Sequence, residues 1–176
     1  MEGPAELRTE RLLLRPFRSE DVGGVLAYAS DPEWNRYLGL PQPYTRRSAE
    51  EFVAASILAD HETRPSWAIV HEGRVSGGIG LTSSSAGTAE LGYSLARPLW
   101  GRGLTTEAAG AVLAHGFESY GLARIYAFAD IRNEGSWRVM EKVGMRREGV
   151  LRSNRLVAGE RIDDVLYAVL SEDPRP

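Results

Sequence analysis

Two glycines flank an arginine just before an amphipathic helix, in the segment Gly101-Arg102-Gly103-Leu104-Thr105. The amides of the first helical turn lack backbone partners and lie at the positive end of the helix dipole. Glycines let a ligand approach the main chain closely, and Arg102 adds a full positive charge. The spacing therefore predicts an anion site, and a plain strand-to-helix turn is the alternative interpretation.

The standard nucleotide motifs do not fit this segment. The dinucleotide motif G-x-G-x-x-G needs a third glycine, but Thr106 stands at that place. After Gly78-Ile79-Gly80 the third glycine is missing as well, and the second glycine and the lysine of a P-loop are absent after Gly101. The anion is therefore not predicted to be bound by either of these folds.

Short alternating strands and a few helices must position this turn. Strand patterns and helix signals predict one α/β domain over residues 1–176, with a mixed, mostly antiparallel sheet of about seven strands and about four helices. A capping box at Ser48-Ala49-Glu50-Glu51 predicts a helix start, and residues 31–45 are expected to form a loop with aromatic content. The expected strands are 12–15, 66–71, 74–82, 89–95, 124–131 and two around the turn 158–160, and helices are expected to begin at Ser19, Ser48, Leu104 and Asn133.

Composition narrows the class of protein. The chain has 21 basic and 24 acidic residues and a net charge of −3, so nucleic-acid binding through bulk charge is not expected. It has no cysteine and no apolar window near the ~20 residues of a membrane span, which favours a cytoplasmic protein without disulfides and no membrane partner. Its three histidines lack ligand spacing, so no metal is expected.

Two ordered blocks resemble the GNAT superfamily of N-acetyltransferases. The first looks like the acyl-CoA-binding segment of that family, and the second is similar to the later motif of its Rim-type branch, which contains ribosomal-protein acetyltransferases. The two ends of the chain are similar to this branch too. The matching segments are 90–95 with 100–108, 133–136 with 141–145, 9–16 and 164–167.

The resemblance implies where acetyl-CoA, as co-substrate, would bind. The coenzyme would lie between two splayed central strands, 89–95 and 124–131, with its pyrophosphate on the amides of residues 101–105 and its pantetheine arm along the strand edge. Pro98 stands where the family usually has Gln or Arg, so a side-chain contact from that place is not expected. The implied coenzyme-binding residues are Tyr93, Ser94, Leu95, Trp100, Gly101, Arg102, Gly103, Leu104, Thr105, Asn133 and Arg138.

The same resemblance suggests catalytic roles. Ser136 would hydrogen-bond or protonate the departing thiolate, and Glu90 would act as general base through water, with Asp130 in reserve. Each has a plainer interpretation: Asn133 is equally well a helix N-cap, Ser136 a solvated serine, and Glu90 an exposed strand carboxylate. Arg138 is also interpretable as an exposed residue in a salt bridge.

The acceptor would be a primary amine. A lysine side chain, with a pKa of ~10.4, is rarely neutral at pH 7, whereas an α-amine, with a pKa of ~8, is neutral about once in ten. A protein N-terminal α-amine is therefore the first expectation. The alternatives are a small-molecule amine (amino acid, polyamine or antibiotic) and a non-catalytic acyl-CoA-binding module. Trp34, Tyr37 and Tyr44 are expected either to line the acceptor pocket or to pack in the core or a lid, and a homodimer is expected by family analogy only.

Overall fold

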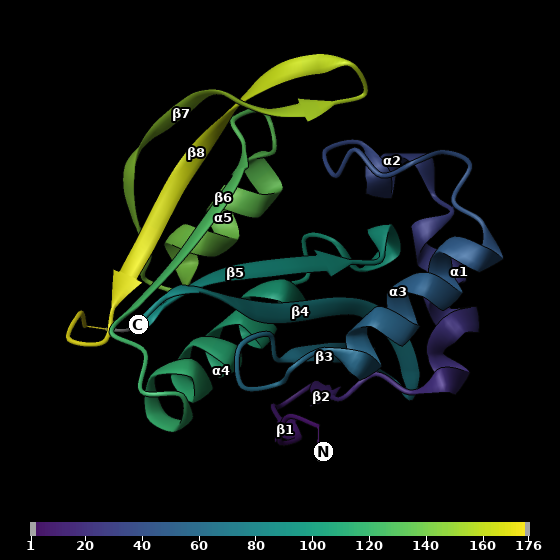
Figure 1. Ribbon diagram of the computed structural model, residues 1–176, viewed down its shortest axis with the longest axis horizontal. Helices are drawn as coiled ribbons and strands as arrows, with labels where there is room; N and C mark the ends of the chain where they lie inside the picture. Colours follow the sequence, from purple (N-terminus) through teal and green to yellow (C-terminus); the bar gives the residue numbers. More distant parts are fainter. Residues whose placement is uncertain (1–2, 175–176) are drawn as a thin grey trace.

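The computed structural model describes residues 3–174, which form one eight-stranded sheet with helices on both faces (Figure 1). The strand order is β1-β2-β3-β4-β5-β6-β8-β7, and every neighbouring pair is antiparallel except β5 and β6. The sheet is therefore mixed and mostly antiparallel, as predicted. The strands are β1 Leu7–Arg8, β2 Leu12–Arg15, β3 Ser66–His71, β4 Arg74–Ser85, β5 Thr88–Leu95, β6 Arg124–Asp130, β7 Arg146–Val157 and β8 Glu160–Leu170.

The helices divide between the two faces. One core cluster joins α4 and α5 to the sheet through side chains such as Leu104, Met140 and Ile69, and a second joins α1 and α3 through Val25, Val53 and the neighbouring β3 residue, Ala68. Successive strand residues point to opposite faces, so β3 contributes to both cores. The helices are α1 Val22–Ala29, α2 Pro32–Asn35, α3 Arg46–Leu58, α4 Leu104–Ser119 and α5 Glu134–Lys142, with 3-10 turns η1 Ser19–Asp21 and η2 Arg97–Leu99.

Several sequence-based expectations differ from the structure. Helix α3 begins at Arg46, because Thr45 is its N-cap and forms the capping box with Ser48; the box predicted to start at Ser48 was wrong. The expected loop at 31–45 contains the short helix α2, whose N-cap Asp31 accepts from the amide of Glu33. An additional two-residue strand, β1, brings the sheet to eight strands rather than about seven.

The middle of the sheet is open. Strands β5 and β6 pair in parallel only through residues 88–90 of β5 and 124–126 of β6, while β5 continues to Leu95 and β6 to Asp130. Beyond Glu90 the two strands diverge, as Figure 1 shows. The splay inferred from the family resemblance is thus present, and the β6-facing edge of β5 has no strand partner there among the described residues.

Among residues 3–174, no helix is both long and apolar enough to cross a membrane.

Candidate active site

The glycine turn before α4 has the backbone that the sequence predicted. Gly101 has φ 74° and Gly103 has φ 78°, conformations that L-residues with side chains rarely adopt. Gly103 is the N-cap of α4, and its carbonyl accepts the first helical bond, from the Glu107 amide at 3.0 Å. The amides of Leu104, Thr105 and Thr106 therefore have no helical carbonyl to donate to. They can donate hydrogen bonds to an anion at the positive end of a sixteen-residue helix.

A clamp from the N-terminal hairpin holds this turn. The Glu107 carboxylate accepts from the Thr9 hydroxyl at 2.6 Å, from the Arg11 amide at 2.8 Å and from Arg11 Nε at 2.7 Å. Arg11 Nη1 also donates to the Arg102 carbonyl at 2.9 Å. Burial would raise the pKa of Glu107, but the hydrogen bonds from Thr9 and Arg11 outweigh it and lower this pKa. The carboxylate is thus ionised and fixes the turn to the first helical turn.

A cleft of about 470 Å³ opens from this turn along the splayed part of β5. We call it the coenzyme cleft, after the ligand that the family resemblance implies. It unites the two sequence blocks, because both the glycine turn and the start of α5 line it. Of the predicted coenzyme-binding residues, Arg102 alone is not part of the lining. The lining includes Tyr93, Ser94, Leu95, Trp100, Gly101, Gly103, Leu104, Thr105, Asn133, Ser136 and Arg138.

Helix α5 is tied to β5 by its serine. The Tyr93 hydroxyl donates to the Ser136 carbonyl at 2.8 Å, and the Ser136 hydroxyl donates to the Tyr93 oxygen at 3.2 Å. Burial raises the pKa of Tyr93 well above its ordinary value, so the phenol stays protonated. Asn133 is the N-cap of α5, since its side chain accepts from the Ser136 amide at 3.3 Å. Both polar side chains therefore reach the cleft from rigid positions.

Glu90 lies at the point where β5 and β6 begin to diverge, and it does not line the coenzyme cleft. Burial raises its pKa, and the hydrogen bond from Tyr126 and the nearby Arg155 guanidinium offset this only in part. A raised pKa suits a group that must take up a proton near neutral pH. Asp130 is less suited, because both of its oxygens bind Arg132 and this contact lowers its pKa. The geometry thus favours Glu90 over the reserve candidate.

The aromatic residues predicted for the acceptor pocket line two clefts. Trp34 and Tyr37 line the coenzyme cleft, and Trp34 and Tyr44 line a second cleft. Arg97 binds Asp31, and neither Arg97 nor Pro98 belongs to the lining of the coenzyme cleft.

Several lining residues escaped the sequence analysis. Thr106 and Lys142 border the coenzyme cleft, and Lys142 brings a positive charge from the last turn of α5. The Trp100 indole donates to the Leu95 carbonyl at 2.6 Å, so this aromatic closes the end of β5. Lys142 could have been predicted from its place four residues after Arg138, which puts the two cations on one face of α5. The Trp100 contact has no signal in the sequence.

The cleft fits a long polyanionic thioester better than a metal. Among residues 3–174, no three His, Asp or Glu side chains gather in a way that could hold a metal ion. Unpaired helix amides and the Lys142 ammonium instead offer hydrogen bonds and charge to phosphates, and the free edge of β5 offers backbone groups to an amide-containing arm.

Comparison with known proteins gives the family. Residues 11–146 match the model of the acetyltransferase (GNAT) domain. The uncharacterized N-acetyltransferase p20 of Bacillus licheniformis is 31% identical over 173 residues, which cover 95% of this chain and 97% of p20. The crystal structure of a GNAT-family acetyltransferase from Bacillus anthracis matches 96% of this chain and 100% of that chain, with a TM-score of 0.87 and 31% identity.

Two more distant structures share the fold. The ribosomal-protein-S5-alanine acetyltransferase of Vibrio fischeri has a TM-score of 0.84 at 20% identity, over 98% of this chain and 100% of its own. The microcin C7 self-immunity acetyltransferase MccE, in complex with acetyl-CoA and AMP, has a TM-score of 0.83 at 17% identity, over 92% of this chain and 93% of its own. The family model and the full-length relative together establish that this chain belongs to the GNAT family of N-acetyltransferases.

Proposed function

We propose that this enzyme transfers the acetyl group of acetyl-CoA to an α-amine by direct attack on the thioester, with no covalent enzyme intermediate. One observation carries the proposal: a single cleft joins the free amides of α4 to the Ser136 hydroxyl along the unpaired edge of β5. In this arrangement the α4 amides and Lys142 hold the phosphates. The β5 edge then directs the thioester toward the splay beside Glu90.

The chain's own groups would handle the protons. Glu90 takes one proton from the acceptor ammonium, through water, so that the nitrogen lone pair can attack the carbonyl carbon. The C–N bond forms, the C–S bond breaks and the sulfur leaves as a thiolate. Ser136 stabilises the thiolate by turning its O–H from Tyr93 toward the sulfur. The second proton of the attacking nitrogen passes to solvent or to the thiolate.

The acceptor can be a protein N-terminus or a small molecule, because both present the same nucleophile. The name of the Vibrio fischeri neighbour supports a protein N-terminus as the first acceptor to test. The aromatic second cleft favours a small-molecule amine.

The test combines binding and turnover. Calorimetry should show acetyl-CoA binding to the wild-type enzyme, and a panel of peptides and small molecules with free α-amines should include at least one that releases coenzyme A. Ser136→Ala should slow release while leaving the affinity for acetyl-CoA within about twofold. An enzyme that binds no acetyl-CoA, or releases coenzyme A with no amine, would refute the proposal.

A further inference from the structure

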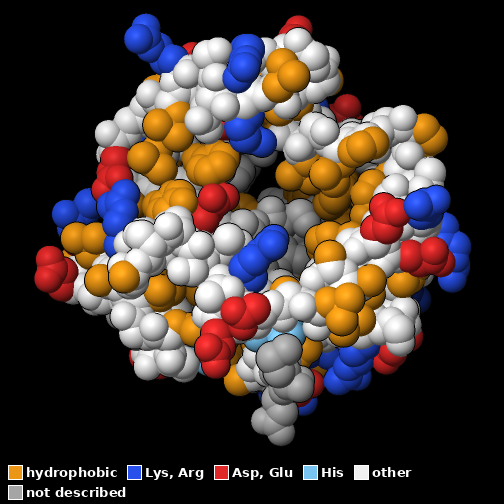
Figure 2. Space-filling view, in the orientation of Figure 1, with side chains coloured by type: hydrophobic (Ala, Val, Ile, Leu, Met, Phe, Trp, Pro, Cys, Tyr) orange, Lys and Arg blue, Asp and Glu red, His pale blue; other side chains and the backbone are white. Residues whose placement is uncertain are grey.

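A second cleft, of about 760 Å³, lies on the face of the sheet that carries α1 and α3. It adjoins the coenzyme cleft, because Trp34, Leu38, Tyr93 and Ser94 line both. Figure 2 shows hydrophobic side chains around a hollow in this face of the molecule. Of this lining, the sequence predicts Trp34 and Tyr44 for an acceptor pocket and Tyr93 and Ser94 for the coenzyme; the other lining residues are not predicted.

The floor of this cleft is bare backbone. Gly80 of β4 and Gly92 of β5 are direct cross-strand partners in the middle of the sheet, and both line the cleft. A Cβ added at Gly92 would meet no heavy atom within 4 Å, so it would project into open space. Glycine weakens a strand interior and often marks a place where a ligand approaches the backbone closely. Gly92 thus leaves room that a side chain would fill, whereas Gly80 is glycine because a Cβ there would meet the Pro65 carbonyl oxygen at 2.9 Å.

The walls are apolar and largely aromatic. They come from the end of β2, from α1 and α2, and from α3. A cleft with such walls recognises an apolar group of matching size, and polar groups at its edge fix the orientation. The aromatic and aliphatic wall residues are Phe17, Val25, Tyr28, Trp34, Leu38, Leu40, Tyr44, Phe52 and Leu58.

One cation at this cleft is in no ion pair. Arg64 lines the cleft, is exposed, and forms no ion pair with any residue in the part of the chain that the structure describes. The carboxylate of Asp60 lines the same cleft and keeps its negative charge, but it accepts from the Thr63 hydroxyl at 2.9 Å and from the Glu62 amide at 3.1 Å rather than from Arg64. The Arg64 guanidinium is therefore available to an anion in the cleft.

Two buried polar atoms of the lining also lack partners. The Trp34 indole nitrogen and the Ser66 hydroxyl are buried and find no hydrogen-bond partner among residues 3–174. An unsatisfied buried polar group costs on the order of 1–3 kcal/mol. A bound molecule with hydrogen-bond acceptors would relieve that cost after a small side-chain adjustment.

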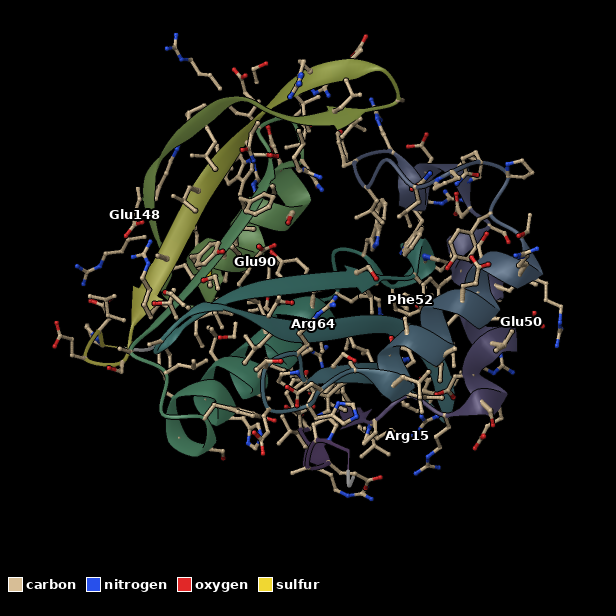
Figure 3. All side chains as sticks on the ribbon, viewed as in Figure 1. Arg15, Glu50, Phe52, Arg64, Glu90 and Glu148 are labelled. Atoms are coloured by element: carbon tan, nitrogen blue, oxygen red, sulfur yellow. The ribbon has the colours of Figure 1, made fainter. Side chains whose placement is uncertain are left out.

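Arg64 and Glu90 lie in one row across the sheet. The amides of Leu81 and Ser83 donate to the carbonyls of Pro65 and Thr63, which places Arg64 opposite Thr82, and Thr82 is the partner of Glu90. With strands ~4.8 Å apart, the backbones of the two charged residues lie roughly 10 Å apart, and their side chains leave the same face of the sheet. Figure 3 labels Arg64 over β4 and Glu90 beside β5.

From these observations we infer that the acceptor is a free α-amino acid with an apolar side chain. This inference rests on the proposed acetyl transfer. The side chain fills the aromatic cleft above Gly92, the carboxylate pairs with Arg64, and the amine lies toward Glu90 and the splay. A carboxylate raises the pKa of an adjacent amine by stabilising the ammonium, and pairing with Arg64 weakens that effect. Arg64 therefore serves both binding and deprotonation of the acceptor.

The experiment compares acids with amides. Coenzyme A release is measured with L-Phe, L-Trp, L-Leu and L-Met, with their amides, and with dipeptides that begin with the same residues. We expect kcat/KM for the best free acid to exceed that for its amide and its dipeptide at least about tenfold. In Arg64→Gln this preference should fall to about one, whereas in Arg74→Gln it should persist. Arg74 is an exposed arginine outside the cleft, also without an ion pair in the described chain.

A second variant tests the floor. Gly92→Val should fill the cleft and raise KM for the acceptor at least about tenfold, while acetyl-CoA affinity and the melting temperature hold. Equal rates for acids, amides and dipeptides, no acetylation of any free acid, or an unchanged KM in Gly92→Val would each overturn the inference. Release of coenzyme A with amides or peptides alone would leave the proposed acetyl transfer intact, whereas no release with any amine would refute both.

Discussion

The two clefts on either side of Tyr93 are built by opposite means. The coenzyme cleft offers main-chain groups: amides freed by the positive-φ glycines 101 and 103, and the unpaired edge of β5. The second cleft offers side chains: aromatic walls and an arginine in no described ion pair, over a floor that is open at Gly92. A backbone site recognises what all acyl-CoA molecules share, whereas a side-chain site can be changed by substitution to suit one acceptor.

This contrast predicts that chemistry and coenzyme binding can be separated. In Glu90→Gln we expect kcat to fall about 10²- to 10⁴-fold, because a general base contributes about that much. Acetyl-CoA affinity, measured by calorimetry, should not change, since Glu90 does not line the coenzyme cleft.

The pH dependence of the same variant sharpens the assignment. Because burial raises the pKa of Glu90, the wild-type rate should rise with pH through a value above the ordinary ~4.3 of glutamate. A carboxyl group whose pKa is raised on folding adds to the free energy of unfolding at pH values below its unfolded-state pKa. This stabilisation is lost as the pH rises through the folded-state pKa. At pH 7 Glu90→Gln should therefore melt no lower than the wild type; a lower melting temperature would assign Glu90 a structural role.

The backbone site should be broken by a change of backbone conformation. Gly103→Val forces a β-branched residue into φ 78°, which costs about 1–2 kcal/mol or more and redirects the helix amides. We expect at least a tenfold loss of acetyl-CoA affinity by calorimetry. The control is Gly110→Ala in the same helix, where a Cβ meets nothing within 4 Å; it should gain roughly 0.5–1 kcal/mol of stability and keep its affinity. Equal affinity in both variants would contradict a backbone-built site.

The next largest effect is expected at the clamp in which the Glu107 carboxylate binds Thr9 and Arg11. Glu107→Gln removes the charge that binds Thr9 and Arg11, so we expect the free energy of unfolding to fall by about 1–3 kcal/mol in urea titrations. Acetyl-CoA affinity should weaken in parallel. Glu118→Gln, at the exposed far end of the same helix, should change neither quantity. A Glu107 variant as stable as its control would show that the clamp contributes nothing.

The smallest effect is expected at Arg102. Its guanidinium is exposed and outside the cleft lining, so its help to a bound polyanion is a screened surface interaction. Arg102→Ala should lower acetyl-CoA affinity by less than about fivefold. A loss as large as that in Gly103→Val would mean that the charge, rather than the backbone, makes the site.

The same contrast explains what sequence could predict. Local features can be predicted because a few neighbouring residues determine them. These features are the glycine turn, the strands with alternating or continuous apolar residues, and the N-cap Asn133. The Rim-like ends of the chain were recognised as motifs, but their physical role was not. Thr9 and Arg11 act on Glu107, 98 and 96 residues away, through hydrogen bonds that no local pattern records.

Most of the second cleft could not be predicted from the sequence, for a related reason. Its walls come from segments that no periodicity links, and α2 lies within a stretch that reads as a loop. The Gly80–Gly92 pair becomes visible only when the register of β4 and β5 is known. Trp34 could be predicted as a pocket residue because it is an aromatic residue in a stretch without periodicity. Tyr37, predicted on the same ground, lines the coenzyme cleft alone.

A crystal structure of the enzyme with acetyl-CoA tests the central claim most directly. The account predicts the pyrophosphate on the amides of residues 103–106 and the thioester in the splay between β5 and β6, beside Ser136. Density for the coenzyme elsewhere, with the turn at Gly101 to Gly103 free of phosphate, would contradict it.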